Sequence, residues 1–345
     1  MSFKHGWDDS QRAFEQVAVQ LGFAPEDGAR AYRRGIEEYR GFLQAYERLG
    51  EQVLREVEDN PDRAYVVLLG RPYNAFTGDA NMGIPRKLSS RGVSVLPFDM
   101  VFEPTADIPP NNYWYFGQQN MKAVARVKER SNLYLTWISN FSCAPDSFLL
   151  HYVRWAMGQK PYLVLEIDSH TADAGLDTRI EGFLDIVESY RRHVEEQPDE
   201  PFQRRYHVVA KTEYCDVVDR QTGQRVDIRD PRVTLVWPSM GDLSTEALRV
   251  ASERQGIRSV CLPLPDGRST QLARNVASGK ECIPALLVLG SILRFFDEHP
   301  PNRPDELWTV FVPSTLGPCR TGQYHVFYDR VFRDLGWENV VQVVG

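Results

Sequence analysis

Three short turns carry the residue type best suited to chemistry in this chain, because each of them contains one cysteine. The three stretches are Asn140–Pro145 with Cys143, Gly279–Pro284 with Cys282, and Gly317–Arg320 with Cys319. Each turn is marked by Gly, Ser or Pro and is followed by an amphipathic stretch. The free N–H groups and the partial positive charge of a helix start stabilise a thiolate. If the turns meet in space, three thiolates converge and could hold a metal cluster.

A simpler interpretation stands beside this one, since a cysteine in such a turn is often only a small side chain that fits. The sequence contains no C-x-x-C, so local spacing does not select iron–sulfur or zinc. A Cys₃His zinc site with His151 or His325 therefore stays open, although His325 is expected to face solvent or to cap its helix. The other two cysteines, Cys215 and Cys261, lie in apolar strand-like runs, and we expect both to pack in the core.

The composition limits the class of protein. In 345 residues, 40 Lys and Arg oppose 47 Asp and Glu, and the resulting net charge of −7 argues against nucleic acid as a partner. No window approaches the roughly 18 apolar residues of a membrane span, and the N-terminus lacks the apolar segment of a signal peptide. Five cysteines, an odd number, do not indicate a disulfide framework. We therefore expect a cytoplasmic protein that contacts neither a membrane nor nucleic acid.

The order of the elements predicts the fold that positions the turns. From Tyr65 onward, short apolar runs alternate with helical patterns, which is typical of parallel sheets covered by helices on both faces. The predicted strands are Tyr65–Leu69, Val93–Leu96, Leu133–Ile138, Pro161–Ile167, Val233–Trp237, Arg258–Leu262, Leu307–Val312 and Val340–Val344. The predicted helices are Ile84–Arg91, Tyr113–Arg130, Asp146–Met157, Thr178–Glu195, Ser244–Gln255, Ser269–Val276, Pro284–Phe296 and Gly322–Leu335. A helical pattern over residues 10–58 precedes them.

We therefore expect an α/β protein with two Rossmann-like parallel-sheet domains and an N-terminal helical segment. The expected boundaries are a helical lead-in at 1–60, a first α/β domain at 61–200, a connecting β-ribbon of two strands at 201–232, and a second α/β domain at 233–345. The last predicted strand ends with the chain, so we expect a fragment of a longer polypeptide. Ligands of such sheets bind at the carboxyl ends of the strands, where this order places Cys143 and Cys319.

Several familiar motifs are absent. The turn Gly70–Asn74 follows the first strand and could line a crevice, but it is not G-x-G-x-x-G, and no P-loop, G-x-S-x-G or H-E-x-x-H is present. ATP hydrolysis, simple esterase chemistry and zincin chemistry are therefore not expected. The acidic turn Asp168–Asp173, which includes His170, is interpreted as a solvated turn with helix-capping acids.

Six motifs, in order along the chain, resemble those of the acyl-CoA dehydratase activase-related proteins, which are relatives of the 2-hydroxyglutaryl-CoA dehydratase subunits. The six motifs are Gly70–Asn74, Asn81–Pro85, Asn140–Phe148, Glu166–Gly175, Gly279–Cys282 and Gly317–Tyr324. The resemblance runs from about Tyr65 to the C-terminus and is weaker at 196–232. It implies two α/β domains with a [4Fe–4S] cluster between them.

By position, the resemblance implies that Cys143, Cys282 and Cys319 are the cluster ligands. Some relatives carry a second cysteine three residues after the one in the Glu-Cys motif, where this chain has Ala285, which favours a single cluster. Three ligands leave one iron open to water, a substrate or a side chain. The polar residues expected in the same cleft are Arg71, Asn74, Asn81, Arg320 and Gln323.

The resemblance also implies a function of the 2-hydroxyacyl-CoA dehydratase type, namely ATP-driven electron transfer at low potential to an acyl-CoA or another small molecule. Such a protein would be a lyase or reductase component, and the ATP-dependent activase would be a separate chain or a missing segment. A homodimer fits the pairing of related subunits in the dehydratases. The alternative is a non-catalytic scaffold or binding module in which the cysteines are structural.

Overall fold

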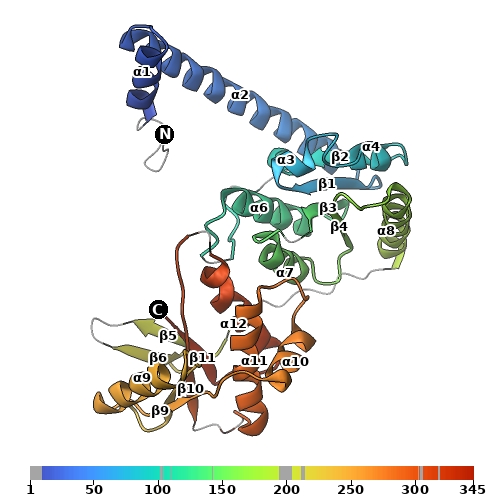
Figure 1. Ribbon diagram of the computed structural model, residues 1–345. Coiled ribbons are helices and arrows are strands. Elements are labelled where there is room, and N and C mark those ends of the chain that lie inside the picture. The colour runs from blue at the N-terminus through green and yellow to red at the C-terminus, as the bar shows by residue number, and fades with distance from the viewer. Residues whose placement is uncertain are drawn as a thin grey trace.

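The computed structural model describes residues 10–101, 103, 105–109, 111–141, 143–193, 204–210, 214–301, 303, 306–317 and 319–345. Figure 1 shows two α/β halves, one above the other, with a pair of helices standing away from the upper half. Each half contains a four-stranded parallel sheet, and a small antiparallel sheet accompanies the lower one. The predicted α/β class with an N-terminal helical segment is confirmed.

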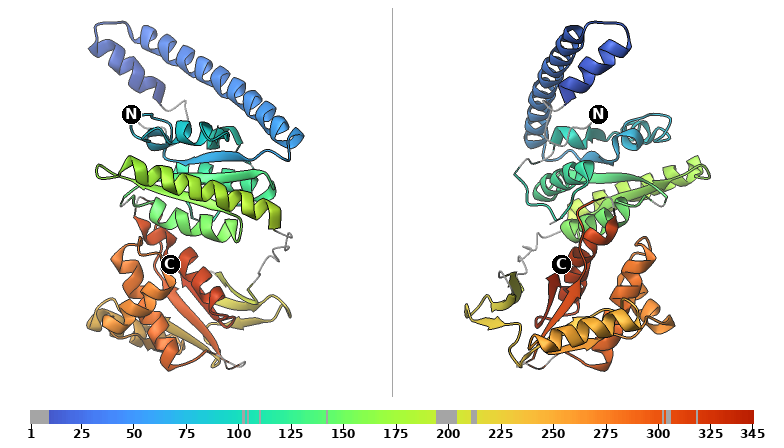
Figure 2. Two further views of the ribbon diagram at one scale, coloured as in Figure 1. Left: turned by 90° about the vertical axis from the view of Figure 1, so that its right-hand side faces the viewer. Right: turned by 60° about the vertical axis from the view of Figure 1, so that its left-hand side comes forward.

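The N-terminal segment is a helical hairpin of α1 (Gln11–Gln20) and α2 (Pro25–Asp59). Pro25 occupies the first turn of α2, where its missing N–H costs nothing, and Asp27 accepts the backbone N–H of Ala24. The far end of α2 meets the first sheet, as both views of Figure 2 show. There Gly50 packs so closely on Met100 that an added Cβ would lie 2.3 Å from the carbonyl oxygen of Met100. The hairpin is therefore anchored at one end of α2.

The first sheet has the strand order β2-β1-β3-β4. Its strands are β1 (Tyr65–Gly70), β2 (Ser94–Pro97), β3 (Leu133–Asn140) and β4 (Tyr162–Ile167). Its helices are α3 (Pro72–Ala75), α4 (Ile84–Ser89), α5 (Phe98–Val101), α6 (Tyr115–Glu129), α7 (Asp146–Met157) and α8 (Asp173–His193). Every residue of β1 is buried, as expected for a central strand that is covered on both faces.

The second parallel sheet has the order β11-β10-β8-β9. Its strands are β8 (Val233–Trp237), β9 (Ser259–Cys261), β10 (Leu307–Val312) and β11 (Val340–Val344). Its helices are α9 (Asp242–Arg254), α10 (Gly267–Val276), α11 (Ile283–Glu298), the short 3₁₀ helix η2 (Arg320–Gln323) and α12 (Tyr324–Asp334). The antiparallel sheet consists of β5 (Tyr206–Ala210), β6 (Cys215–Asp219) and β7 (Arg225–Asp227). It has three strands where two were predicted.

The two parallel sheets share one topology. Numbered within each half, both have the order 2-1-3-4, because β8, β9, β10 and β11 take the places of β1, β2, β3 and β4. The order reverses between the first and third strands of each sheet, and such a switch point is where α/β sheets bind ligands. Cys143 follows β3 and Cys319 follows β10, so these two cysteines occupy equivalent positions in the two halves.

A continuous hydrophobic core crosses the boundary between the halves. It contains residues of the first half, such as Phe148 and Tyr152 of α7, together with Leu289 of α11 and Phe327 of α12. The rings of Phe148 and Phe327 meet edge to face with their centroids 6.1 Å apart. The interface is therefore packed like a domain interior, which fixes the turns that start α7, α11 and α12 relative to one another.

Candidate functional site

Each of the three cysteine turns ends at a helix that faces the other half of the molecule. Cys143 lies three residues before Asp146, the first residue of α7, Cys282 is the N-cap of α11, and Cys319 precedes η2 and α12. In Figure 1 the starts of α7, α11 and α12 belong to the central region where the two halves meet. The prediction that the turns lie at helix starts is confirmed.

Side-chain contacts tie the turns together across the interface. Arg320, next to Cys319, donates from Nη1 to Ser147 Oγ at 3.1 Å, near the Cys143 turn. Lys280, two residues before Cys282, pairs with Glu166 of β4 at 3.0 Å. Both the Cys282 turn and the Cys319 turn therefore contact the first half close to the carboxyl ends of its strands.

Glu281, the residue before Cys282, forms the most deeply buried of these contacts. Its carboxylate accepts hydrogen bonds from His151 Nε2 of α7, from the N–H and hydroxyl of Ser278 and from the N–H of Gly279. Burial alone would raise the pKa of Glu281, but the hydrogen bond and charge of His151 and the N–H of Ser278 outweigh it and hold that pKa at about 2. The Cys282 turn is thus fixed on α7 by the buried contact between Glu281 and His151.

Tyr324, the first residue of α12, contacts Cys282 and is close enough to Cys319 for that thiol to affect its pKa. Its hydroxyl oxygen is 2.9 Å from Cys282 Sγ, and burial, followed by the neighbouring Cys282 thiol, raises the pKa of Tyr324. Cys319 Sγ lies 3.2 Å from Thr321 Oγ1, and this hydrogen bond, together with the N–H of Thr321, lowers the pKa of the exposed Cys319 thiol. The surroundings of Cys319 therefore favour its thiolate form.

Cys143 has a different environment. Burial and the nearby carboxyl group of Asp146 raise the pKa of its thiol. Asp146 is itself buried; its Oδ2 accepts from Ser139 Oγ at 2.6 Å and from Trp137 Nε1 at 3.3 Å. Its other oxygen, Oδ1, faces Arg71 Nε at 4.0 Å, and neither of these two buried atoms has a hydrogen-bond partner among the described residues. The ion pair of Arg71 and Asp146 therefore lies beside Cys143.

The predicted polar residues divide into two groups. Arg71 and Arg320 reach the cysteine turns, as described above. Asn74, Asn81 and Gln323 are buried and their amides serve the framework: Asn74 donates to the carbonyl of Ile138 at 3.5 Å, and Asn81 bonds within the loop after β1. Gln323 accepts from Tyr152 Oη at 2.8 Å and donates to the carbonyl of Asn111, which joins the halves directly beneath the Cys319 turn.

No three side chains of His, Cys, Asp or Glu lie close enough to hold a metal ion within the ranges that the structure describes. The donor set fits an iron–sulfur cluster in chemical type only, because thiols are its usual ligands and the three cysteines stand on turns at one interface. The hydroxyl groups of Tyr324 and Thr321 lie within hydrogen-bond distance of the sulfurs of Cys282 and Cys319, and hydrogen bonds to sulfur tune the potential of such clusters. Pro318 and Ser142, which belong to the predicted motifs, lie outside the described residues.

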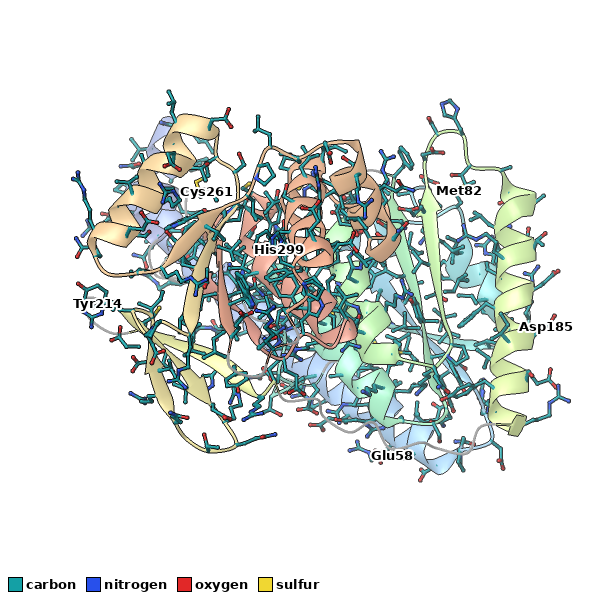
Figure 3. All side chains as sticks on the ribbon, turned by 90° about the horizontal axis from the view of Figure 1, so that it is seen from below. Glu58, Met82, Asp185, Tyr214, Cys261 and His299 are labelled. Atoms are coloured by element: carbon teal, nitrogen blue, oxygen red, sulfur yellow. The ribbon has the colours of Figure 1, made fainter. Side chains whose placement is uncertain are left out.

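The two remaining cysteines and His325 differ in how deeply they are buried. Cys215 is buried in a small core cluster with Val217 and Val226, as predicted. Cys261 is only half-buried and donates to the carbonyl of Thr245 at 3.2 Å. Figure 3 places Cys261 at the opposite end of the molecule from Met82. His325, which was expected to face solvent or to cap its helix, is half-buried in the first turn of α12, and burial lowers its pKa.

A family comparison covers the start of the chain. The family described as CoA enzyme activase uncharacterised domain (DUF2229) matches residues 1–101. The match includes the helical hairpin, to which the sequence pattern assigned no chemistry, and extends through the loop after β1 that carries Arg71 and Asn81. No curated protein and no solved structure gives a significant match.

The sequence did not identify two side chains that contact the site, Tyr324 and Glu281. Tyr324 and Glu281 stand inside the predicted motifs, yet their contacts with Cys282 and His151 form only in the folded chain. It also missed that each cysteine turn exposes a large apolar side chain: Phe141 is 71% exposed, Ile283 56% and Leu316 83%.

Proposed function

We propose that this protein is a [4Fe–4S] protein of the 2-hydroxyacyl-CoA dehydratase type, with Cys143, Cys282 and Cys319 as cluster ligands. A bound cluster would supply one-electron chemistry at low potential, with one iron open to a small molecule. The activase that delivers the electrons would be a separate chain, and an acyl-CoA is the substrate class that the resemblance implies.

The observation that carries the proposal is the placement of three cysteine turns on one packed interface. Arg320–Ser147 and His151–Glu281 tie two of the turns to the start and the middle of α7, and the third turn leads directly into α7. When bound to iron as a thiolate, Cys282 would still accept the hydrogen bond of the Tyr324 hydroxyl. Residues 1–101, which match the CoA enzyme activase domain, link the chain to acyl-CoA enzyme systems.

The exposed apolar residues Phe141, Ile283 and Leu316 support the partner in this proposal. An electron donor must approach a cluster closely, and a rim of exposed apolar side chains on the same three turns offers it a contact surface. Under this proposal, the rim residues are buried when the activase docks.

A second candidate function, a scaffold with structural cysteines, is favoured by the local partners of the thiols. Cys282 lies against Tyr324, Cys319 lies against Thr321, and no three-residue metal group is assembled among the described side chains. In that case the three cysteines act only as small packing residues, and the cleft binds its partner without iron.

The deciding experiment is anaerobic reconstitution with iron and sulfide, followed by measurement of iron, zinc and the electron paramagnetic resonance spectrum of the reduced protein. The proposal expects about four irons per chain and a broad absorbance near ~400 nm. Replacing Cys143, Cys282 or Cys319 by Ser should lower the iron content, whereas the matched variant Cys261→Ser should retain it. A colourless protein that takes up no iron, or a triple variant that keeps its iron, contradicts the cluster. Stoichiometric zinc would support a zinc site instead.

A further inference from the structure

The helical hairpin exposes more apolar side chains than its length explains. Among the described residues, 21 large apolar side chains are exposed, and eight of them belong to residues 10–59 of a chain of 345. These eight are Val17, Val19, Leu21, Phe23, Tyr39, Phe42, Leu43 and Leu49. Single exposed apolar side chains are ordinary on a protein surface, whereas a group of them on one element is typical of a contact surface.

Helix α2 is covered only near its two ends. Its buried residues are Gly28, Ala29 and Tyr32 at the end that packs on α1, and Gly50 and Val57 at the end that packs on the first half. All of α2 is described, and none of its 17 residues from 33 to 49 is buried. At 1.5 Å per residue they span about 25 Å, more than twice the roughly 10 Å width of a helix. Along this length α2 extends away from the first half (Figures 1 and 2).

The uncovered stretch carries the apolar pattern of a helix that pairs with another helix. Ile36, Tyr39, Leu43 and Tyr46 follow one another at intervals of three, four and three residues, which is the spacing of the a and d positions in paired helices. Phe42 lies beside this stripe and stacks on Tyr46, with the ring centroids 5.5 Å apart. A helix in a protein gains most of its stability by burying such a stripe. The stripe therefore indicates a helical partner.

A groove runs along one edge of this stripe. Its volume is about 630 Å³, and it is lined by Gln11 of α1 and by residues of α2 from Tyr32 to Gln44, among them Ile36 and Arg40. Gly41 also lines the groove, and a Cβ added there would meet nothing within 4 Å. Side chains of a second helix can therefore enter the groove beside the stripe.

The charges along this edge favour a second copy of the chain as the occupant. Arg40 and Glu47 are seven residues apart, so both lie on the edge that carries the groove. Both side chains are exposed, and neither makes a hydrogen bond or an ion pair within the described chain. They stand on either side of Leu43, so an antiparallel pair of α2 helices with its two-fold axis near Leu43 places each Arg40 opposite Glu47 of the other copy. A parallel pair would place Arg40 beside Gly35, without a carboxylate.

We propose that the uncovered middle of α2 binds the same surface of a second copy of this chain, antiparallel about a two-fold axis near Leu43, with each Arg40 paired to Glu47 of the other copy. A two-fold axis requires one surface to be complementary to itself, and this is the commonest arrangement of homodimers. The resemblance to the dehydratase subunits implied a homodimer but no surface for it, whereas this proposal rests on α2 alone. It is independent of the proposed cluster, because the cysteine turns lie outside α2.

Sedimentation velocity of the intact chain tests the proposal. Between about 1 and 100 µM, the wild-type protein should pass from monomer to dimer. Leu43→Glu brings two carboxylates together at the axis and should weaken dimerisation at least about tenfold, while circular dichroism shows unchanged helix content because Leu43 is exposed. The matched control Ile186→Glu, on the exposed face of α8, should dimerise like wild type. A wild-type monomer at all these concentrations, or a Leu43→Glu variant that dimerises like wild type, would overturn the proposal and leave the surface to a different partner.

Charge reversal tests the pairing of Arg40 with Glu47. Arg40→Glu leaves two carboxylates on this edge of α2 and Glu47→Arg leaves two cations, so each variant alone should dimerise about tenfold more weakly than wild type. In an equimolar mixture the two variants present opposite charges to each other, and they should form a mixed dimer about as tightly as wild type. A fluorescent label on one variant identifies the mixed dimer during sedimentation. A mixture that dimerises as weakly as the single variants would overturn the antiparallel pairing.

Discussion

The sulfur of Cys282 lies 2.9 Å from the hydroxyl oxygen of Tyr324, and this contact joins the starts of α11 and α12. Tyr324 is 4% exposed, and burial, followed by the neighbouring Cys282 thiol, raises the pKa of its hydroxyl group. A thiol next to a buried phenol has a fixed position before any metal arrives. The contact therefore bears both on stability and on the proposed cluster.

Replacing Tyr324 by Phe removes the hydroxyl group that contacts Cys282 and keeps the aromatic ring. We expect the free energy of unfolding of the metal-free protein to fall by about 1 kcal/mol, as for one buried hydrogen bond, measured by urea denaturation. In the reconstituted protein, the reduction potential should become more negative, because hydrogen bonds to sulfur raise the potential of an iron–sulfur cluster. Tyr115→Phe, on the exposed face of α6, is the matched control and should change neither quantity. A variant with wild-type stability and potential would show that the contact is incidental.

The second prediction concerns Gln323, which is fully buried between the halves. Gln323→Leu leaves the hydroxyl of Tyr152 and the carbonyl of Asn111 without their partner. We expect a loss of roughly 2–3 kcal/mol in the free energy of unfolding, since two buried polar groups become unsatisfied. Chemical denaturation followed by tryptophan fluorescence measures it, and Gln271→Leu on the surface of α10 should cost less than about 0.5 kcal/mol. Equal losses in the two variants would mean that Gln323 does not join the halves.

Local sequence patterns were sufficient for most elements of this fold. The helix Asp146–Met157 and the strand Leu307–Val312 were predicted with the boundaries that the structure has, because Pro145 and the apolar period mark them. Strand β7 (Arg225–Asp227) was missed because three residues, two of them charged, show no period. Helix α3 (Pro72–Ala75) was also missed, because four residues are too few to show a helical period of apolar side chains.

The arrangement of the site could not be predicted in the same way. Glu281 and His151 are separated by 130 residues, and no local pattern tells which buried histidine a glutamate will meet. The equivalence of Cys143 and Cys319 depends on the shared strand order 2-1-3-4, which follows from strand pairing rather than from spacing. Residue types identified the candidates, but packing decided which of Arg71, Arg320, Asn74, Asn81 and Gln323 reach the turns and which hold the framework.

The third prediction uses two glycines in helices. In α11, a Cβ on Gly290 would lie 2.0 Å from the carbonyl oxygen of Ser269 in α10, so the two helices pack through this position. Gly290→Ala should destabilise the protein by roughly 1–3 kcal/mol, because the helices must separate. Gly182→Ala in α8 meets nothing within 4 Å and should stabilise by about 0.5–1 kcal/mol through helix propensity. Thermal unfolding compares them, and a change of the same sign in both variants would contradict the close packing of α10 on α11.

The last prediction concerns the anchor of the helical hairpin, where Tyr46 of α2 donates to Asp99 Oδ1 of α5 at 2.9 Å. Tyr46→Phe leaves a half-buried carboxyl group without this donor and should cost about 1 kcal/mol, whereas Tyr115→Phe on the exposed face of α6 should cost little. Burial raises the pKa of Asp99 above its usual value of 3.8, against the opposing effect of Tyr46. An acid whose pKa is higher in the folded chain favours folding most when protonated, so its contribution is lost as pH rises from near 4 through the folded pKa. Since Tyr46 lowers that pKa, Tyr46→Phe should raise it further and enlarge the loss. Urea denaturation between about pH 3.5 and 7 should therefore show a difference between Tyr46→Phe and wild type that grows with pH, and a difference that shrinks with pH would show that Asp99 does not depend on Tyr46.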